Sequence, residues 1–235
     1  MPLGAARLNT LGKAQAEAGR SSVSATTVGN TQIDTAQSKF GGASVIFDGS
    51  GDRLDLATGT ISGNFTIEFF IRWNNLSSNF QYPISNRGGG GSGRLWLENR
   101  NTDDLRISWD NGDNALKTHD LTNVISTNTW YHYTIMVKGD TLYFFIDGVS
   151  KLTGNADWNG AILNNNSSGN MYLGGATFGQ NWNGHIDEFR LSDTDRYSTS
   201  GFTTPSTAFI NDANTIALFH MDGTDGSTTF TDDAS

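Results

Sequence analysis

NTWYHYTIMVKGDTLYFFIDG, residues 128–148, is the most informative stretch of the 235-residue sequence. It contains two segments rich in aromatic and β-branched residues, separated by Lys138, Gly139 and Asp140. Segments of this kind on either side of a short glycine-containing turn are typical of a β-hairpin. We therefore predict two antiparallel strands here.

Further strand signals recur at regular intervals from Thr31 onward. Residues 64–73, NFTIEFFIRW, alternate cleanly, which predicts one core-facing set of side chains and one set facing away. The core-facing set is Phe65, Ile67, Phe69, Ile71 and Trp73, and the opposite set is Asn64, Thr66, Glu68, Phe70 and Arg72. Other strands are predicted within residues 43–56, 82–99, 105–112, 169–175, 185–191 and 214–221. No segment after the N-terminal region shows sustained helical periodicity, so we predict an all-β, two-sheet antiparallel sandwich.

The composition agrees with many short strands joined by turns. Gly, Thr, Asn and Ser make up 100 of the 235 residues, and Pro occurs three times. The net charge of −9 argues against a nucleic-acid-binding surface, which needs clustered Lys and Arg. Because the chain has no cysteine, disulfides and thiolate metal sites are excluded.

Residues 1–30 are predicted to form an N-terminal arm ahead of a sandwich over residues 31–235. The alanine-rich residues 1–20 favour a short helix, which either frays or docks on a partner. Residues 21–30 fit a linker or an edge strand. The start has no apolar run long enough for a signal peptide or a membrane span. We therefore expect synthesis in a cytoplasm and no membrane insertion.

Four ordered blocks resemble the laminin-G-like branch of the concanavalin A-like lectin/glucanase jelly rolls. They are the hairpin at 128–148, KFGGASVIFDGSGDRLDL (39–56), FTIEFFIRW (65–73) and WNGHIDEFRLSD (182–193). The resemblance implies a jelly-roll sandwich. It implies no particular function, because this fold carries lectins, hydrolases and structural modules.

Three other segments are similar to segments of phage virion proteins that carry such modules. They are DTAQSKFGGAS (34–44), RYSTSGFTTPSTAF (196–209) and LFHMDGTDGSTTFTD (218–232). This resemblance implies a virion protein that is made in a host cytoplasm and acts outside the cell. Its expected partners are other virion proteins and further copies of itself.

The strand predicted over residues 214–221, NTIALFHM, is apolar on both faces, although only turn-like, acidic residues follow it. In the modules it resembles, such a strand usually precedes the block at 39–56. We expect it to pair within its own subunit. The alternatives are exchange into a neighbouring subunit, a plain closing strand against residues 44–47, and a docking strand for a following module that has been lost.

A candidate sugar-binding groove combines Glu68 and Arg72 with Arg94, Trp96 and Glu98, expected on the non-core side of adjacent strands. Aromatic platforms and paired polar groups suit the apolar faces and the hydroxyls of sugars. The alternative is a solvated face with cross-strand Arg–Glu pairs.

Trp158 and Trp182 form a second candidate site, because both lie in turns rich in Asn and Gly. A large ring in such a turn either plugs the end of the sandwich or offers a binding surface.

Hydrolysis is not favoured. The glucanases of this fold carry Glu-x-Asp-x-x-Glu, and none of the four glutamates stands in that spacing. Glu68 and Glu98 could still meet across neighbouring strands, so a glycan hydrolase is kept as an alternative.

The family resemblance also implies a structural calcium ion. Asp187 matches a ligand position on the family's last strand, and Gly49 matches a backbone ligand near the first Asp-Gly turn. In the alternative interpretation, Asp187 caps a turn by accepting backbone hydrogen bonds.

Together these patterns predict a non-enzymatic phage virion structural protein, either a head decoration or a tail-associated protein. It would display a lectin-like sandwich for adhesion to host-surface glycans. The alternative is a carbohydrate-binding receptor-recognition module of a tail fibre.

Overall fold

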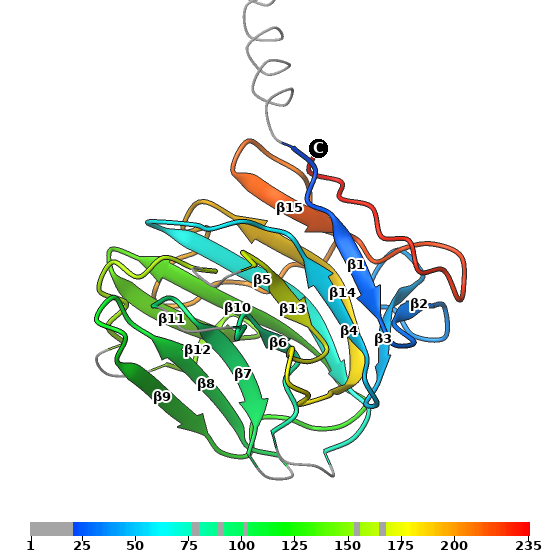
Figure 1. The fold of residues 1–235 in the computed structure, drawn as a ribbon, viewed down its shortest axis with the longest axis horizontal. Helices are drawn as coiled ribbons and strands as arrows, with labels where there is room; N and C mark the ends of the chain where they lie inside the picture. Colours follow the sequence, from blue (N-terminus) through cyan, green and yellow to red (C-terminus); the bar gives the residue numbers. More distant parts are fainter. Residues whose placement is uncertain (1–20, 77–79, 89–91, 101–102, 153–155, 165–167) are drawn as a thin grey trace, which may run out of the picture.

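The computed structural model describes residues 21–76, 80–88, 92–100, 103–152, 156–164 and 168–235 (Figure 1). Every regular element in these ranges is a β-strand, and the strands form two antiparallel sheets packed as a sandwich. The predicted all-β jelly roll is therefore confirmed. Within the same ranges, no helix is long and apolar enough to cross a membrane.

The first sheet has seven strands in the order β1-β4-β13-β6-β7-β8-β9. Their bounds are β1 Ala25–Val28, β4 Arg53–Leu56, β6 Ile84–Ser85, β7 Leu95–Asn99, β8 Leu105–Asp110, β9 Leu116–Leu121 and β13 Met171–Leu173.

The second sheet has eight strands in the order β12-β11-β10-β5-β14-β3-β2, with β15 also paired to β14. Their bounds are β2 Gln32–Asp34, β3 Ser44–Asp48, β5 Phe65–Trp73, β10 Trp130–Lys138, β11 Thr141–Ile146, β12 Val149–Ser150, β14 Asn183–Ser192 and β15 Thr215–Phe219.

The hairpin predicted at 128–148 is formed by β10 and β11. Lys138 pairs with Thr141, so Gly139 and Asp140 are the two turn residues. Both have positive φ values, 53° and 61°, as a type I′ turn requires. This turn has the twist of the flanking strands, which explains why such a short loop joins them.

The core lies between the two sheets and uses the predicted inward face of β5. Its side chains from Phe65 to Trp73, at alternate positions, are all buried in the main apolar cluster. Facing them across the sandwich are apolar side chains of the seven-stranded sheet, including Leu97, Ile107 and Leu173.

The sandwich begins earlier than expected. β1 pairs with β4 as the edge strand of the seven-stranded sheet, so residues 25–28 belong to the sandwich and not to an arm. This outcome confirms the edge-strand interpretation of residues 21–30. Residues 1–20, the rest of the predicted arm, lie outside the described residues.

The late strand, β15, pairs with β14 of its own chain. β3 pairs with Asn183–Ile186 of β14, β15 pairs with Phe189–Ser192, and β5 runs along the other edge. β3 and β15 thus share one edge of β14 end to end, and a bulge lies between Asp187 and Arg190. The expected pairing within one subunit is confirmed, whereas the alternative closing strand against residues 44–47 is wrong.

The C-terminal tail after β15 is tied to the start of the sandwich. The Asp232 carboxylate accepts hydrogen bonds from the backbone amides of Val23 (2.8 Å), Leu218 (2.9 Å) and Ala234 (3.0 Å). Farther along, Ile33 of β2 exchanges backbone hydrogen bonds with Gly226 and Ser227. Figure 1 accordingly shows the red tail beside the blue strands.

Residues 193–214, between β14 and β15, form what we call the covering segment. It crosses the outer face of the eight-stranded sheet, where the Phe209 ring lies 5.8 Å from that of Phe70. Phe202 contacts Phe145 and donates its backbone N–H to the carbonyl of Gly148. This side of the sheet is therefore buried as well.

Candidate functional site

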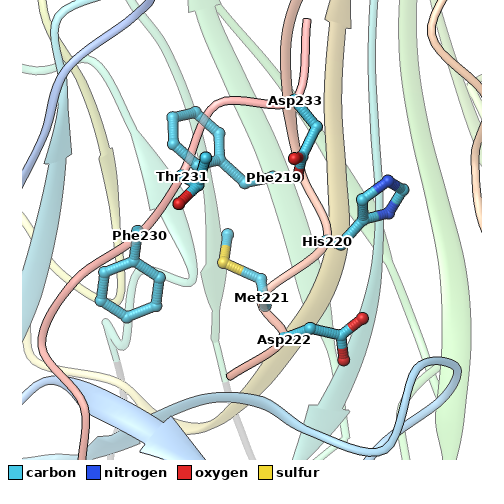
Figure 2. A pocket seen from close by; sticks show the side chains of 7 residues that line it. All are labelled: Phe219, His220, Met221, Asp222, Phe230, Thr231 and Asp233. Atoms are coloured by element: carbon cyan, nitrogen blue, oxygen red, sulfur yellow. The ribbon is translucent and has the colours of Figure 1, made fainter. Parts of the chain in front are cut away.

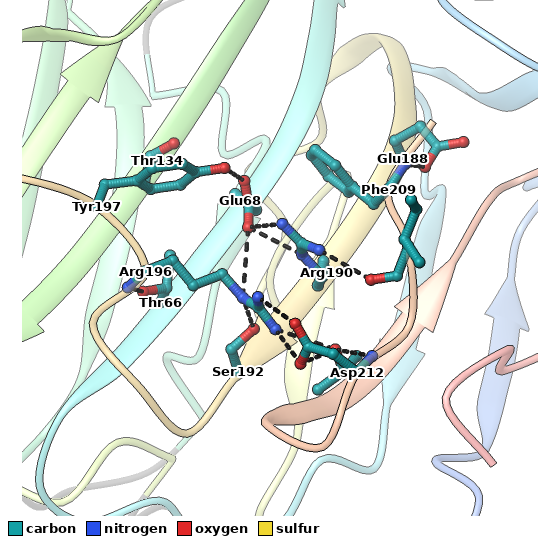
Figure 3. A network of polar contacts seen from close by, with 12 residues as sticks. Thr66, Glu68, Thr134, Glu188, Arg190, Ser192, Arg196, Tyr197, Phe209 and Asp212 are labelled. Carbon is teal, nitrogen blue, oxygen red and sulfur yellow. Dashed lines mark hydrogen bonds and ion pairs between the residues drawn. The ribbon is translucent and has the colours of Figure 1, made fainter. Parts of the chain in front are cut away.

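Glu68 lies at the centre of a buried ion network beneath the covering segment (Figure 3). Its Oε1 accepts hydrogen bonds from Arg190 Nε (2.9 Å) and Nη2 (2.7 Å). Its Oε2 accepts one from the Tyr197 hydroxyl (2.7 Å) and lies 3.2 Å from His132 Nε2. Burial alone would raise the pKa of Glu68, but the hydrogen bond to His132 and the positive charge of Arg190 outweigh it and lower this pKa. The network fixes the covering segment to the sheet.

The expected groove with Glu68 on an open face is therefore wrong. Glu68 and Phe70 are fully buried, and Arg72 donates to the side chains of Asn74 and Asn128. The alternation along the sequence correctly predicted that these residues lie on the outer face of the sheet. It did not predict that the covering segment lies over Glu68 and Phe70.

The two halves of the predicted groove also lie on different sheets. Glu68 and Arg72 are on β5 of the eight-stranded sheet, whereas Arg94, Trp96 and Glu98 lie on or beside β7 of the other sheet. Their outward faces point to opposite sides of the sandwich. For the same reason Glu68 and Glu98 cannot form the carboxylate pair of a glycan hydrolase.

Trp158 and Trp182 plug the sandwich. Both rings are fully buried in the main core, where Trp158 packs against Phe65 and Trp182 packs against Trp73. The Trp158 Nε1 donates a hydrogen bond to the carbonyl of Ala161 (2.6 Å). These residues offer no binding surface.

Asp187 and Gly49 do not come together as ligands of one ion. In the β3–β14 ladder, Asp48 pairs with Asn183 and Val45 pairs with Ile186, so Gly49 and Asp187 lie beyond opposite ends. Asp187 Oδ2 instead accepts backbone hydrogen bonds from Lys39 (2.6 Å) and Phe40 (3.0 Å), which agrees with the turn-capping interpretation. Burial raises the pKa of Asp187 to about 7.

No three His, Asp or Glu side chains gather at metal-binding distance in the described ranges. The structural calcium ion itself stays a prediction.

A cavity of about 280 Å³ opens between the end of β15 and the C-terminal tail (Figure 2). Its lining combines three apolar side chains with polar and acidic ones: Phe219, His220, Met221, Asp222, Phe230, Thr231 and Asp233. His220 Nδ1 lies 2.9 Å from the Glu188 carboxylate, which also accepts the backbone amide of Phe209.

The outer face of the seven-stranded sheet is different, because loop aromatics and arginines lie over it. Strand register places Tyr172, Ser85, Trp96, Ser108 and Thr118 in one row across five strands. The inward neighbours of these residues, such as Leu95 and Leu97, belong to the core. The row therefore faces away from the core.

Over the middle of this row lies the Trp96 patch, which we define as Tyr82, Arg87, Trp96, Ala176 and Phe178. The Arg87 guanidinium carbon is 4.5 Å from the centroid of the Trp96 ring and 5.1 Å from that of Phe178. The Tyr82 and Phe178 rings meet edge to face, with centroids 6.3 Å apart. Trp96 is nearly buried beneath, while the Phe178 side chain is 53% exposed.

A tight turn, a backbone hydrogen bond and a glycine hold the patch in place. Ala176 and Gly179 exchange backbone hydrogen bonds, which closes a tight turn with Phe178 inside it. The Arg87 amide donates to Ser85 Oγ (3.0 Å). At Gly88, a Cβ atom would lie 2.9 Å from the Tyr172 hydroxyl, so a side chain there would push this loop off the sheet.

The patch also holds hydrogen-bonding groups that are not satisfied. Trp96 Nε1 and Ser108 Oγ are buried and have no hydrogen-bond partner among the described residues. Trp96 and Ser108 are direct cross-strand neighbours, so the two unsatisfied groups come from one register position. A buried polar group without a partner costs about 1–3 kcal/mol of stability.

Glu98 is close to the patch. It lies 3.9 Å from Arg106 across the strands, which is a cross-strand Arg–Glu pair of the kind expected as the alternative to a sugar site, and 3.5 Å from Arg100 on its own segment. Burial, together with the negative charge of Glu98, raises the pKa of the Tyr82 phenol. Arg94 is paired with Asp110.

A family model described as the concanavalin A-like lectin/glucanases superfamily (Laminin_G_3) matches residues 48–200. The chain belongs to this superfamily. No curated protein matches the chain in sequence.

Several solved structures share the superfamily's fold with this chain. They include the binding domain of Paraclostridial Mosquitocidal Protein 1 (TM-score 0.58, 16% identity) and the botulinum neurotoxin serotype D ligand binding domain in complex with N-acetylneuraminic acid (0.57, 18%). The serotype G binding domain is a third (0.55, 12%). Each alignment covers 74% of this chain, and the chain spans 45%, 43% and 44% of these domains in turn. At these identities the likeness shows the fold alone, and the phage attribution stays a prediction.

Within this concanavalin A-like sandwich, Trp96 is the one patch residue predicted from the sequence, and Tyr82, Arg87 and Phe178 were not predicted. Arg87 stands beside a run of glycines, and Phe178 stands in a turn with no strand pattern. The only sequence signal for Phe178 was a large aromatic residue next to glycine in a loop.

Proposed function

We propose that this protein is a non-enzymatic carbohydrate-binding module whose binding surface is the Trp96 patch. The observation that carries the proposal is the exposed Phe178 ring, held edge to face against Tyr82 above the sheet. A fixed, exposed aromatic ring offers an apolar platform for the C–H face of a sugar.

The polar groups around this platform support the same function. The Arg87 guanidinium lies over the Phe178 ring, and its Nη1 donates to the Tyr82 hydroxyl. Sugars combine apolar faces with many hydroxyls, so this mixture suits them. On the opposite sheet, the covering segment buries Phe70 and the Glu68 network.

Binding to a glycan array tests the proposal. We expect Phe178→Ala to abolish glycan retention, because it removes the platform and little else. Ile210→Ala is the matched control, since Ile210 is 76% exposed on the covering segment of the other sheet. Equal retention by both variants would place the site elsewhere, and no retention by the unmodified protein would exclude the function.

We further propose a phage virion as the setting, with the module facing outward for host adsorption. This proposal is supported by the three segments similar to phage virion proteins. It allows a head decoration, a tail-associated protein or a tail-fibre receptor module.

Light scattering separates an assembly role from an independent module. The full chain is compared with a variant that starts at Ser21 and so keeps β1. An oligomer that is lost on removing residues 1–20 favours a virion building block assembled through its N-terminal residues. A monomer in both cases favours an independent binding module.

A further inference from the structure

We infer that the Trp96 patch selects saccharides that carry a carboxylate on the sugar ring, with Arg87 as the carboxylate ligand. The inference rests on the proposed function and adds the chemical class of the ligand. It starts from a difference between Arg87 and the other arginines of the same sheet face.

Those other arginines already have acidic partners. Each has a carboxylate oxygen within 4 Å: Asp55 for Arg53, Asp110 for Arg94, Glu98 for Arg100 and Asp120 for Arg106. Arg87 has no carboxylate partner anywhere in the described part of the chain. Its charge is therefore not neutralised by a neighbouring acid.

Arg87 also keeps most of its hydrogen-bonding capacity. A guanidinium has five N–H donors, and one of them, on Nη1, donates to the Tyr82 hydroxyl (3.1 Å). Its position between the Trp96 and Phe178 rings restrains the side chain through cation–π contacts. A restrained guanidinium fork with free donors matches the two oxygens of a carboxylate.

The spacing points to a carboxylate on the sugar ring itself. The Arg87 guanidinium carbon is 5.1 Å from the centroid of the Phe178 ring. A sugar that contacts the exposed part of the Phe178 ring is therefore close enough for a substituent of its own ring to reach Arg87. A sialic acid and a uronic acid both carry such a carboxylate.

The acidic character of the whole chain does not prevent this binding. At physiological ionic strength, exposed charges more than about 8 Å apart are largely screened, so the nearest groups dominate. The carboxylate whose charge acts on Tyr82 is that of Glu98, and it is engaged by Arg100 and Arg106.

The test compares matched acidic and neutral ligands on the full chain. Titrations use 3′-sialyllactose against lactose, and oligogalacturonate against its carboxyl-reduced form. We expect at least one acidic ligand to bind about tenfold or more tightly than its neutral counterpart. The pair that shows this preference identifies the source of the carboxylate.

Variants then assign the preference to Arg87. Arg87→Gln is expected to bring the acidic ligand down to the affinity of the neutral one. Arg94→Gln is the matched control, because Arg94 lies on the same sheet face but is already paired with Asp110. It should keep the preference.

Two results would overturn the inference, and they differ in what they leave standing. Equal binding of acidic and neutral ligands by the unmodified protein rejects the carboxylate but keeps the carbohydrate function. No binding of any saccharide rejects both. Because the ligand comparison needs no variant, it holds even if Arg87→Gln folds poorly.

Discussion

The outer faces of the two sheets carry similar side chains and differ in what lies over them. On the eight-stranded sheet, Glu68, Arg190 and Phe70 are sealed under the covering segment. On the seven-stranded sheet, Trp96 lies under Arg87, and the ring of Phe178 is left in contact with solvent. An arginine and aromatic residues thus stabilise the fold on one face and form a candidate ligand site on the other.

The comparison shows how a site can be located in a fold that has many functions. Strand alternation says which side chains leave the core, but only the loops decide whether they reach solvent. Here the covering segment buries Glu68 and Phe70 on one sheet, whereas the Phe178 ring over the other sheet stays exposed. The following predictions test this division.

The largest difference in the free energy of unfolding is expected between variants of two arginine-paired carboxylates, one on each face. Glu68→Gln leaves Arg190 without its buried counter-charge and should lower the free energy of unfolding by about 3–5 kcal/mol. Asp120→Asn removes an acid that is 54% exposed and paired with Arg106, and should cost at most about 1 kcal/mol. Urea denaturation measures both, and similar losses would mean that the Glu68 network is not sealed from water.

The next largest difference in the free energy of unfolding is expected between alanine variants of two phenylalanines, one on each face. Phe209→Ala empties a buried position between Phe70 and His132 and should cost about 3 kcal/mol. Phe178→Ala should change the free energy of unfolding by at most about 0.5 kcal/mol. Thermal unfolding followed by circular dichroism gives both values. A large loss at Phe178 would show that the Trp96 patch is part of the core and not a ligand surface.

A smaller, pH-dependent effect on the free energy of unfolding is expected from Asp187 on the covered face. Its pKa is about 7 in the folded protein and ordinarily 3.8, so the folded state binds more protons between these values. Stability contributed by this group therefore falls as the pH rises from about 4 to about 7, and levels off above that.

Asp187→Asn removes the titrating carboxyl group. The side-chain amide oxygen of the asparagine can still accept the hydrogen bonds from the backbone amides of Lys39 and Phe40. We expect the variant to be more stable than the unmodified protein at pH 8, by on the order of 2 kcal/mol, and to show little difference at pH 4. Denaturation at the two pH values checks the sign. A gain that is the same at both would exclude titration of Asp187 as its cause.

Much of the fold could be predicted from sequence because its signals are local. The β10–β11 hairpin follows from Gly139 and Asp140, and the core face of β5 follows from strict alternation. The strand β15 was predicted from its two apolar faces, and its burial under the tail explains them.

The candidate site was only partly predictable, because it depends on contacts between distant segments. Nothing in the local pattern of residues 193–214 indicates that they cover Glu68, since the segment has no strand or helix periodicity. Sheet order could not be predicted either, so residues on β5 and β7 seemed to be neighbours. Trp158 and Trp182 could plug the sandwich or line a surface, and only the packing around each ring decides between these roles.

The carboxylate of Asp232 has a consequence for how this domain combines with others. By holding Val23 beside the tail, it brings the entry and exit points of the sandwich to one edge. Circular permutation is then a modest change: a short linker can join the two points, and new ends can open at the exposed turn between β10 and β11. By the same geometry, the domain can be inserted into a surface loop of another protein without separating the ends of that loop.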